Sequence, residues 1–453
     1  MKLTIGALGL ALALVAALQN SQEVCCQLDS AQSGSGPGGI GLFKAFLSPL
    51  RETLKQAKRL LGNRVSDVEN FVHTNFDQLQ QQTFKMFAQM YNKTYSPTEL
   101  PKRMALFFQR RKLIEDSVRA FSEGKLPFLM RENSFVDWDE HELKTLAGSP
   151  MPKSIKDLTA EELEVIFGRN KNKQQDSLVQ DDTKSNEIEH SDSDGTITID
   201  IDEPALVKSS WSALEANMSV RAPVSIPAHK DWRKSGCVAE PINQGRCGCC
   251  YAVATMGVVE AMRCISRVSS PILSAQQVID CSTKRMGYNN FGCDGGWSTE
   301  VMRYLDRVGT AARETCYPLV KRQEYCKLDR VKYTSGCTVS SSISDSAFRY
   351  KVLNNERDIL YHVANTGPVV TVMRATDRFL YYGSGIFDDP SCSRDKEDVD
   401  HAIAIVGYGR ENGQDYWLIK NSWGKEWGID GYGKYKRGSY ACSIGHWGWV
   451  LLK

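Results

Sequence analysis

The chain has 453 residues, of which 42% are hydrophobic and 24% charged, and its formal net charge at pH 7 is +2. This near-neutral charge gives no reason to expect a nucleic-acid partner, and the length predicts two or three structural units. Of the 14 cysteines, twelve lie from Cys237 onward. That density favours an oxidising compartment over the cytosol.

The N-terminus has the pattern of a secretory signal peptide. Lys2 precedes an apolar run that reaches Leu18, and Val15-Ala16-Ala17 is a small-residue cleavage pattern. We therefore predict a signal peptide over residues 1–17 and a soluble chain in the secretory pathway, bound for the lysosome or the extracellular space. No other stretch is apolar enough to predict a membrane span.

Residues 18–80 are a predicted N-terminal extension of the unit that follows them. Within it, apolar side chains follow helical spacing from Leu42 to Leu61, with basic residues near the opposite face. An amphipathic helix that packs within this N-terminal region and a helix at a membrane surface are both compatible with this pattern.

Residues 81–150 are predicted to form a helical unit. Glu99, Arg103, Phe107 and Ile114 are spaced by four, four and seven residues, which places them on one face of a long helix. Glu99 and Arg103 alone indicate an i, i+4 ion pair on a solvated face. Two glycosylation sequons begin at Asn92 and Asn217.

Residues 151–221 are predicted to be a disordered acidic connector. Between Asp176 and Glu203 there are ten acidic residues and one lysine, with few aromatic residues. The remaining residues, 222–453, are enough for a substantial folded core.

The segment from Gln244 to Tyr251 carries a candidate nucleophile. Cys250 follows a glycine-rich loop at the predicted start of a helix, where the helix dipole and free amides stabilise a thiolate and lower the thiol pKa. His401 opens an apolar strand run, and Asn421 follows another. These residues supply a general base and an amide to orient it, which predicts acyl transfer.

Each of these residues also has a simpler interpretation. Cys247 and Cys250 form a C-x-x-C pair, which by itself is typical of a redox dithiol or half of a zinc site. No second C-x-x-C exists to complete a four-thiolate site, so we predict no metal. His401 could be a core histidine, Asn421 a turn residue and Gln244 a solvated amide.

Five motifs in order resemble the papain-like cysteine peptidases. They are the segment around Cys250, Gly292–Gly296, Gly385–Phe387, the block at His401, and Asn421-Ser422-Trp423-Gly424. The resemblance spans the chain from about Phe84 to its C-terminus, apart from the connector. It implies an α+β, two-lobed fold with the active-site cleft between a helical lobe and a β lobe. Residues 81–150 resemble the inhibitory propeptides of the cathepsin L type, through the helix at Glu99 and the segment Asn133–Asp137. This resemblance implies that residues 18–80 are an N-terminal extension of the pro-region.

By this resemblance Cys250 is the nucleophile, His401 the base and acid, Asn421 its orienter, and Gln244 an oxyanion-hole donor. The implied activity is that of a cysteine peptidase made as an inactive zymogen. An endopeptidase is implied rather than an exopeptidase, because no His-His insertion of the cathepsin B kind lies near Cys316–Cys326. It implies protein or peptide substrates, the propeptide as intramolecular inhibitor, no cofactor and a monomer. The alternative is a papain-fold scaffold without proteolytic activity. The implied substrate-binding residues are Gly295, Gly296, Trp297, Val372, Val399, Asp400, Trp423 and Trp447.

The resemblance also implies three disulfide bridges, Cys247–Cys293, Cys281–Cys326 and Cys392–Cys442. With Cys250 kept free, five cysteines remain within residues 222–453, so at least one more thiol in this region stays free or pairs elsewhere, and Cys264 is a plausible buried thiol. The residue before the nucleophile, usually Ser or Ala in the family, is Cys249, so a vicinal disulfide with Cys250 is open. The five cysteines without an assigned partner are Cys237, Cys249, Cys264, Cys316 and Cys337.

Local patterns predict the elements of the C-terminal region. Helices are expected at Cys250–Arg267, at Ser274–Asp280 with a serine cap, and at Trp297–Val308. Apolar runs separated by glycine-rich turns predict strands. These runs are residues 369–373, 402–408, 416–420 and 432–435.

Overall fold

The computed structural model describes residues 80–147, 226–268, 271–342 and 348–452. The predicted signal peptide, nearly all of the N-terminal extension with its 42–61 helix, the acidic connector and the Asn217 sequon lie outside these residues. The chain divides into two compact units, the first made of the described residues up to Arg111 with Val136–Trp138, and the second of Lys112–Phe135 with the residues from Asp139 onward.

The first unit is a small helical cluster around aromatic side chains. Residues 80–90 are helical, and helix α4 (Leu100–Ser122) begins here and continues into the second unit. Phe84, Phe87 and Phe107 are buried and in mutual ring contact. Their buried area is the main source of stability in a unit this small. Asn92 of the described sequon is exposed.

The carboxylate of Asp137 holds the first unit together. Lys93 Nζ and the Tyr95 hydroxyl each bind this carboxylate at 2.5 Å, and Asp137 is 1% exposed. Arg103 donates to the Asp137 carbonyl at 3.2 Å, whereas its ion pair with the exposed Glu99 is long, at 3.9 Å. A buried charge needs partners, so Asp137 contributes more here than the surface pair does.

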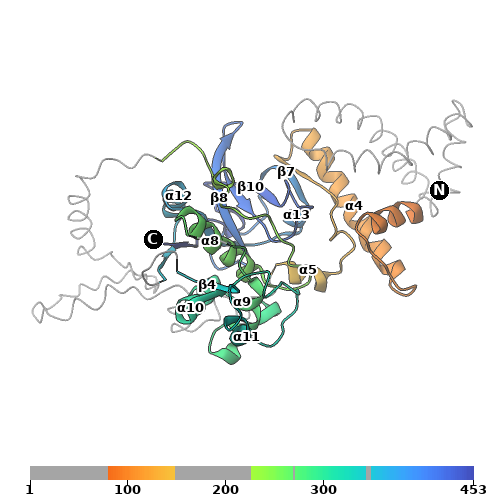
Figure 1. The fold of residues 1–453 in the computed structure, drawn as a ribbon. Coiled ribbons are helices and arrows are strands. Elements are labelled where there is room, and N and C mark those ends of the chain that lie inside the picture. The colour runs from red at the N-terminus through yellow and green to blue at the C-terminus, as the bar shows by residue number, and fades with distance from the viewer. Residues whose placement is uncertain (1–79, 148–225, 269–270, 343–347, 453) are drawn as a thin grey trace, which may run out of the picture. The chain divides into compact units, whose positions relative to one another are not determined.

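The second unit has a helical part arranged around one buried helix. Helix α8 (Cys250–Ile265) is central, with α9 (Ala275–Cys281), α10 (Ser298–Val308) and α11 (Leu328–Lys332) grouped on one side of it and the larger sheet on the other (Figure 1). The Ser274 side chain caps α9 by accepting from the Gln277 amide. The three helices predicted for this region are therefore confirmed.

The second unit also contains a nine-stranded sheet. The strand order is β1-β7-β10-β9-β8-β6-β11-β5, with β2 paired to β8, and β3 and β4 make a separate two-stranded sheet. The four predicted strands are confirmed as β6, β8, β9 and β10. The strands are β1 (Phe128–Met130), β2 (Lys230–Asp231), β3 (Thr310–Ala312), β4 (Thr338–Ser340), β5 (Tyr350–Leu353), β6 (Val369–Met373), β7 (Tyr382–Phe387), β8 (His401–Glu411), β9 (Gln414–Lys420), β10 (Tyr432–Lys436) and β11 (Gly448–Leu451).

The remaining helices are short. They are α5 (Glu140–Leu146), η3 (Trp232–Ser235), η4 (Lys284–Met286), η5 (Gly292–Asp294), α12 (Glu356–Asn365), α13 (Asp377–Leu380) and η6 (Ala441–Ser443). Helices on one side and a mixed sheet on the other confirm the predicted α+β fold. In the part of the chain that the structure describes, no helix is long and apolar enough to cross a membrane.

Two features of this fold position the candidate site. The first turn of α8 and the start of β8 belong to one apolar cluster, which brings Cys250 to the strand that begins at His401. In addition, β1 pairs with β7 in antiparallel register, Phe128 opposite Gly385. Gly385 has a φ of +81°, and a β carbon there would lie 2.5 Å from the Pro127 carbonyl oxygen, so glycine permits this close pairing.

Five disulfides cross-link the second unit. Cys247–Cys293, Cys281–Cys326 and Cys392–Cys442 are the pairs that the resemblance implies. The other two bridges are Cys237–Cys264 and Cys316–Cys337. The expectation that Cys264 is a free buried thiol is therefore wrong, because the end of α8 lies against Cys237 with a Cα–Cα distance of 5.3 Å. Cys249 and Cys250 are both free and buried.

Candidate active site

Cys250 is the first residue of α8, and its side chain meets the start of β8. The backbone N–H of Ala402 donates to the Cys250 sulfur at 3.5 Å. Because Ala402 directly follows His401, this contact brings the thiol and the imidazole residue together across 150 residues of sequence. Cys250 is only 4% exposed.

His401 is held by an amide and covered by an indole. Its Nε2 atom lies 2.8 Å from Asn421 Oδ1, and the Trp423 ring stacks on the imidazole with centroids 4.6 Å apart. Asn421 Oδ1 also accepts the Ser422 backbone N–H, which fixes the orientation of the amide. The Nδ1 atom has no hydrogen-bond partner among the described residues. Of the two ring nitrogens, Nδ1 is therefore the one that is not engaged by Asn421.

Gln244 is held so that its amide nitrogen donates into the site. The Ser422 hydroxyl donates to Gln244 Oε1, and the Ser422 carbonyl accepts the Gln244 backbone N–H at 2.9 Å. With Oε1 occupied, Nε2 donates to the Cys247 carbonyl at 2.9 Å. The same nitrogen donates toward two carbonyls of the segment before the connector, Leu146 at 3.3 Å and Thr145 at 3.4 Å.

The Leu146 carbonyl thus binds the side chain that is predicted to stabilise an oxyanion. Leu146 is the last residue of α5, so its carbonyl has no partner within the helix. Gln244 and the Trp423 indole N–H, the latter at 3.1 Å, supply the missing donors. Leu146 itself is completely buried. In the full-length chain, a peptide carbonyl therefore lies between the Gln244 amide nitrogen and the Trp423 indole N–H.

Burial keeps the thiol and the imidazole neutral in this state. Burial raises the pKa of the Cys250 thiol to about 12 and lowers the pKa of His401 to about 4. A lowered thiol pKa, expected from the helix N-terminus alone, is therefore not found here, because loss of solvation outweighs the amide donors. Burial likewise raises the pKa of Asp400 to about 6, against the Ala375 N–H and the Arg374 charge, which lower it.

Of the eight predicted substrate-binding residues, Trp423 stacks on His401 and Asp400 directly precedes it, and the other six fall into two groups. Gly295 and Gly296 follow η5, and a β carbon on Gly296 would lie 2.4 Å from Asn290 Oδ1, so no side chain fits there. The second group belongs to the apolar cluster that contains Cys250 or packs against it. Its members are Trp297, Val372, Val399 and the partly buried Trp447.

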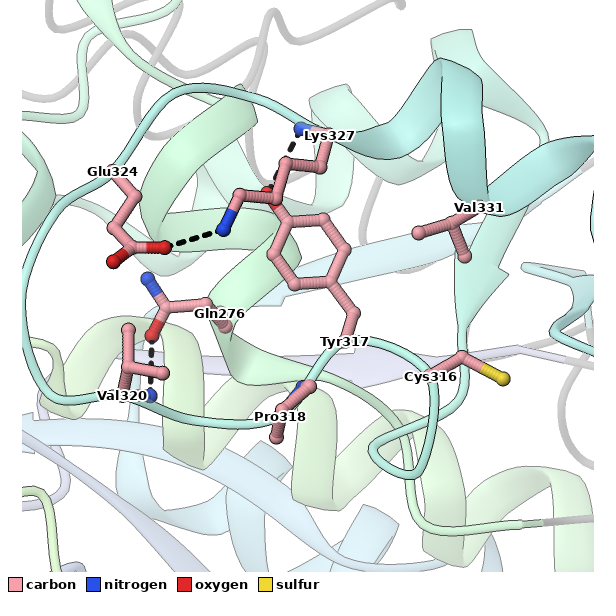
Figure 2. A pocket seen from close by; sticks show the side chains of 8 residues that line it. All are labelled: Gln276, Cys316, Tyr317, Pro318, Val320, Glu324, Lys327 and Val331. Carbon is pink, nitrogen blue, oxygen red and sulfur yellow. Dashed lines mark hydrogen bonds and ion pairs between the residues drawn. The ribbon is translucent and has the colours of Figure 1, made fainter.

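A separate pocket of about 140 Å³ lies in the helical part, and it includes none of the predicted catalytic residues (Figure 2). Its polar atoms are already in use. Val320 N–H donates to Gln276 Oε1 at 2.9 Å, and the Lys327 N–H donates to the Tyr317 hydroxyl at 3.0 Å. These bonds hold the loop at 318–327 rather than leaving donors for a ligand. No cluster of metal-ligating side chains occurs among the described residues.

Sequence reasoning missed two contributors to the site. Ser422 stands in a motif that was singled out, yet nothing in the sequence indicated that its hydroxyl orients Gln244. The Leu146 carbonyl carries no side-chain signal, because any residue at the end of α5 would present the same group.

Comparisons with known proteins agree with this geometry. The family described as papain family cysteine protease matches residues 226–448. Cysteine proteinase 3 of Solanum lycopersicum is 37% identical over 49% of this chain and 59% of its own length. Pro-cathepsin H of Mus musculus is 33% identical over 51% of this chain and 67% of its own length.

A solved structure also matches more of this chain than the peptidase region alone. The digestive procathepsin L2 proteinase from the larval midgut of Tenebrio molitor aligns with a TM-score of 0.60 at 26% identity, over 83% of this chain and all of that one. The match to the tomato relative spans less than two thirds of that protein. This chain belongs to the papain family of cysteine proteases.

Proposed function

We propose that this protein is the zymogen of a cysteine endopeptidase whose catalytic residues are Cys250, His401, Asn421 and Gln244. One observation carries the proposal. A peptide carbonyl, that of Leu146, binds Gln244 Nε2 beside the buried Cys250 thiol and the His401–Asn421 pair. An intramolecular segment thus binds where a substrate carbonyl would bind.

The proposed reaction has two steps. The Cys250 proton passes to His401 Nδ1, and the sulfur attacks the scissile carbonyl carbon to give an oxyanion that accepts from Gln244 Nε2 and the Cys250 N–H. The C–N bond then breaks, and His401 protonates the leaving amine. Water, deprotonated by His401, next attacks the acyl-enzyme, which releases the carboxylic acid and restores the thiol. Asn421 holds the ring in register throughout.

Contacts made by residues before the connector support latency. The β1 strand pairs with β7, the Asn133 side chain donates to the Leu380 carbonyl at 2.7 Å, and Arg131 donates to the Gly428 carbonyl at 2.7 Å. Together with Leu146 these contacts act as an inhibitor within the same chain. Substrate access and an ionised thiol then require this segment to leave.

We further propose that the processed unit begins near residue 222, acts as a monomer on protein or peptide substrates in the lysosome or extracellular space, and uses no cofactor. The predicted signal peptide and acidic connector support this processing order. Gly295, Gly296, Trp297, Val372, Val399, Asp400, Trp423 and Trp447 are proposed to contact substrate.

Self-processing tests the proposal. Wild type and Cys250→Ala are expressed in secretory cells and shifted to acidic pH with no added protease. We expect wild type to release a product of about half the chain and to cleave an internally quenched peptide blocked at both ends, whereas Cys250→Ala does neither. An active-site epoxide probe should label Cys250 in the product.

The alternative is a scaffold that has kept the fold but lost activity. Its signature would be a processed chain that neither cleaves the blocked peptide nor reacts with the epoxide under reducing conditions, and that result would reject the endopeptidase. Processing of Cys250→Ala at the wild-type rate would instead show that another protease performs the maturation.

A further inference from the structure

Arg246 holds a carboxylate beside the proposed oxyanion position. Its guanidinium nitrogen lies 2.8 Å from a carboxylate oxygen of Glu142, whose side chain is 11% exposed while that of Arg246 is 60% exposed. The other Glu142 oxygen accepts the Asp139 backbone N–H at 2.8 Å. The Glu142 carboxylate is therefore held in one orientation, with one oxygen on the Arg246 guanidinium and the other on a backbone N–H.

This contact lies close to the proposed chemistry. Arg246 is two residues after Gln244. Glu142 is one helical turn before Leu146, the residue whose carbonyl binds Gln244. One turn of helix advances about 5 to 6 Å, a distance that an extended substrate covers in about two residues. A substrate carboxylate within about two residues of the cleaved bond can thus reach Arg246.

A second positive charge lies at the same loop. Lys321 packs on Gly245, where a β carbon would lie 2.9 Å from Lys321 Cδ. The loop that carries Lys321 is held on both sides by the hydrogen bonds of Val320 and Lys327 (Figure 2). The Lys321 charge also acts on the neighbouring thiol of Cys249, where it opposes the rise in pKa that burial causes. Two cations on neighbouring loops, Arg246 and Lys321, favour an anionic partner.

We propose that Arg246 is a specificity-determining residue of the processed enzyme, which selects peptides whose carboxylate side chain reaches the place that Glu142 occupies in the zymogen. The inference rests on the proposed endopeptidase function and names its substrate class: peptides with Asp or Glu close to the cleaved bond. The chain's own Glu142 shows the chemistry of the partner. Lys321 adds attraction without being required for the contact.

Paired substrates test this on the processed enzyme. Internally quenched peptides that differ only in Glu or Gln at one position are scanned across the three residues on each side of the cleaved bond. We expect one position, within about two residues of the cut, at which Glu raises kcat/KM about three- to fivefold over Gln, the range of a solvent-exposed ion pair. The preference should shrink in 0.5 M salt, because exposed charges are screened.

Variants then assign the preference. In Arg246→Gln the Glu-to-Gln ratio should fall to about one while cleavage of the Gln peptides is kept, and Arg246→Lys should retain part of it. Arg410→Gln removes another exposed arginine, which pairs with Asp415, and should leave the ratio unchanged. A ratio of one at every position in wild type, or a preference that survives Arg246→Gln, would overturn the inference alone. Failure to cleave any peptide would overturn the proposed function and this inference with it.

Discussion

Ser422 holds Gln244 at two points, one on the backbone and one on the side chain. The Ser422 carbonyl accepts the Gln244 N–H at 2.9 Å, and the Ser422 hydroxyl donates to Gln244 Oε1. An amide side chain can present either its oxygen or its nitrogen, and the hydroxyl contact selects the nitrogen for the site. The residue after the proposed His401 orienter thus prepares the proposed oxyanion donor.

The first prediction concerns this orientation. Ser422→Ala leaves Gln244 Oε1 without its donor, so the amide can rotate, and we expect kcat to fall about fivefold to tenfold with little change in KM. Gln244→Ala removes the donor itself and should cost on the order of 100-fold. Steady-state kinetics on processed enzymes measure both. Because Ser422 acts through Gln244, an additional loss on adding Ser422→Ala to Gln244→Ala would contradict this account.

The second prediction concerns latency. Asn133 is buried and donates to the Leu380 carbonyl at 2.7 Å, and loss of such a bond costs about 1 kcal/mol. Asn133→Ala should therefore raise the rate at which the epoxide probe labels Cys250 in the full-length chain about fivefold. Asn365→Ala, an exposed asparagine on α12, serves as the control. Equal labelling rates in the two variants would show that Asn133 does not restrain the segment.

The third prediction concerns acid stability. Burial lowers the pKa of His401 to about 4 from 6.5. Between these values the unfolded chain binds a proton that the folded chain does not, so the free energy of unfolding falls as the pH drops from about 6.5 to about 4. We compare the full-length Cys250→Ala chain with the same chain carrying His401→Gln. On acidification, the free energy of unfolding of the second chain should fall by up to about 3 kcal/mol less than that of the first.

Asp400 changes the free energy of unfolding with pH in the opposite direction to His401. It is present both in the Cys250→Ala chain and in the chain that also carries His401→Gln, so its effect cancels in the comparison. Its pKa is raised to about 6, so the stability it gives is complete below its unfolded pKa and is lost as the pH rises through 6. Urea unfolding of the two chains at pH 4 and pH 7 isolates the His401 contribution. If acidification lowers the free energy of unfolding of both chains by the same amount, the folded chain does not hold His401 neutral.

The fourth prediction concerns the second thiol. Cys249 is completely buried, and burial raises its pKa strongly, so it should be unreactive as a nucleophile. Cys249→Ala should label with the epoxide within about twofold of the wild-type rate, and alkylation of native processed enzyme should modify Cys250 alone. A vicinal disulfide between Cys249 and Cys250 would instead give a native mass two hydrogens below that of the enzyme with five disulfides. The epoxide would then label Cys250 only after reduction.

The fifth prediction concerns the apolar pocket. Trp447 packs against the cluster that contains Val372 and Val399, and its indole N–H donates to the Lys396 carbonyl at 3.0 Å. We expect the processed enzyme to prefer small or medium aliphatic residues two positions before the cut and to reject Arg. Trp447→Leu should shift the preference toward Phe over Val about tenfold, measured with a positional-scanning library. A wild-type preference for Arg at that position would contradict this pocket.

Much of the fold was predictable because its signals are local. Ser274 marks the start of α9 through a cap that spans three residues, and the run at 369–373 is apolar on both faces because both faces of β6 are buried. The order of the motifs around Cys250, His401 and Asn421 likewise lies in the sequence. The three-residue strand β1 was not predicted, because it depends on pairing with the distant β7. Helix α5 was not predicted either, although the capping box of Asp139 and Glu142 is a local signal for its start.

The sequence by itself determined the residue types of the site, the family and the positions of the main helices and strands. Tertiary structure alone decided that Cys264 pairs with Cys237 and that Glu142 binds Arg246. It also decided that the Cys250 thiol has a raised pKa rather than a lowered one. The physical reason is common to all three. Pairing and solvation depend on which atoms meet across long stretches of chain, and a local pattern carries no information about the groups that will cover it.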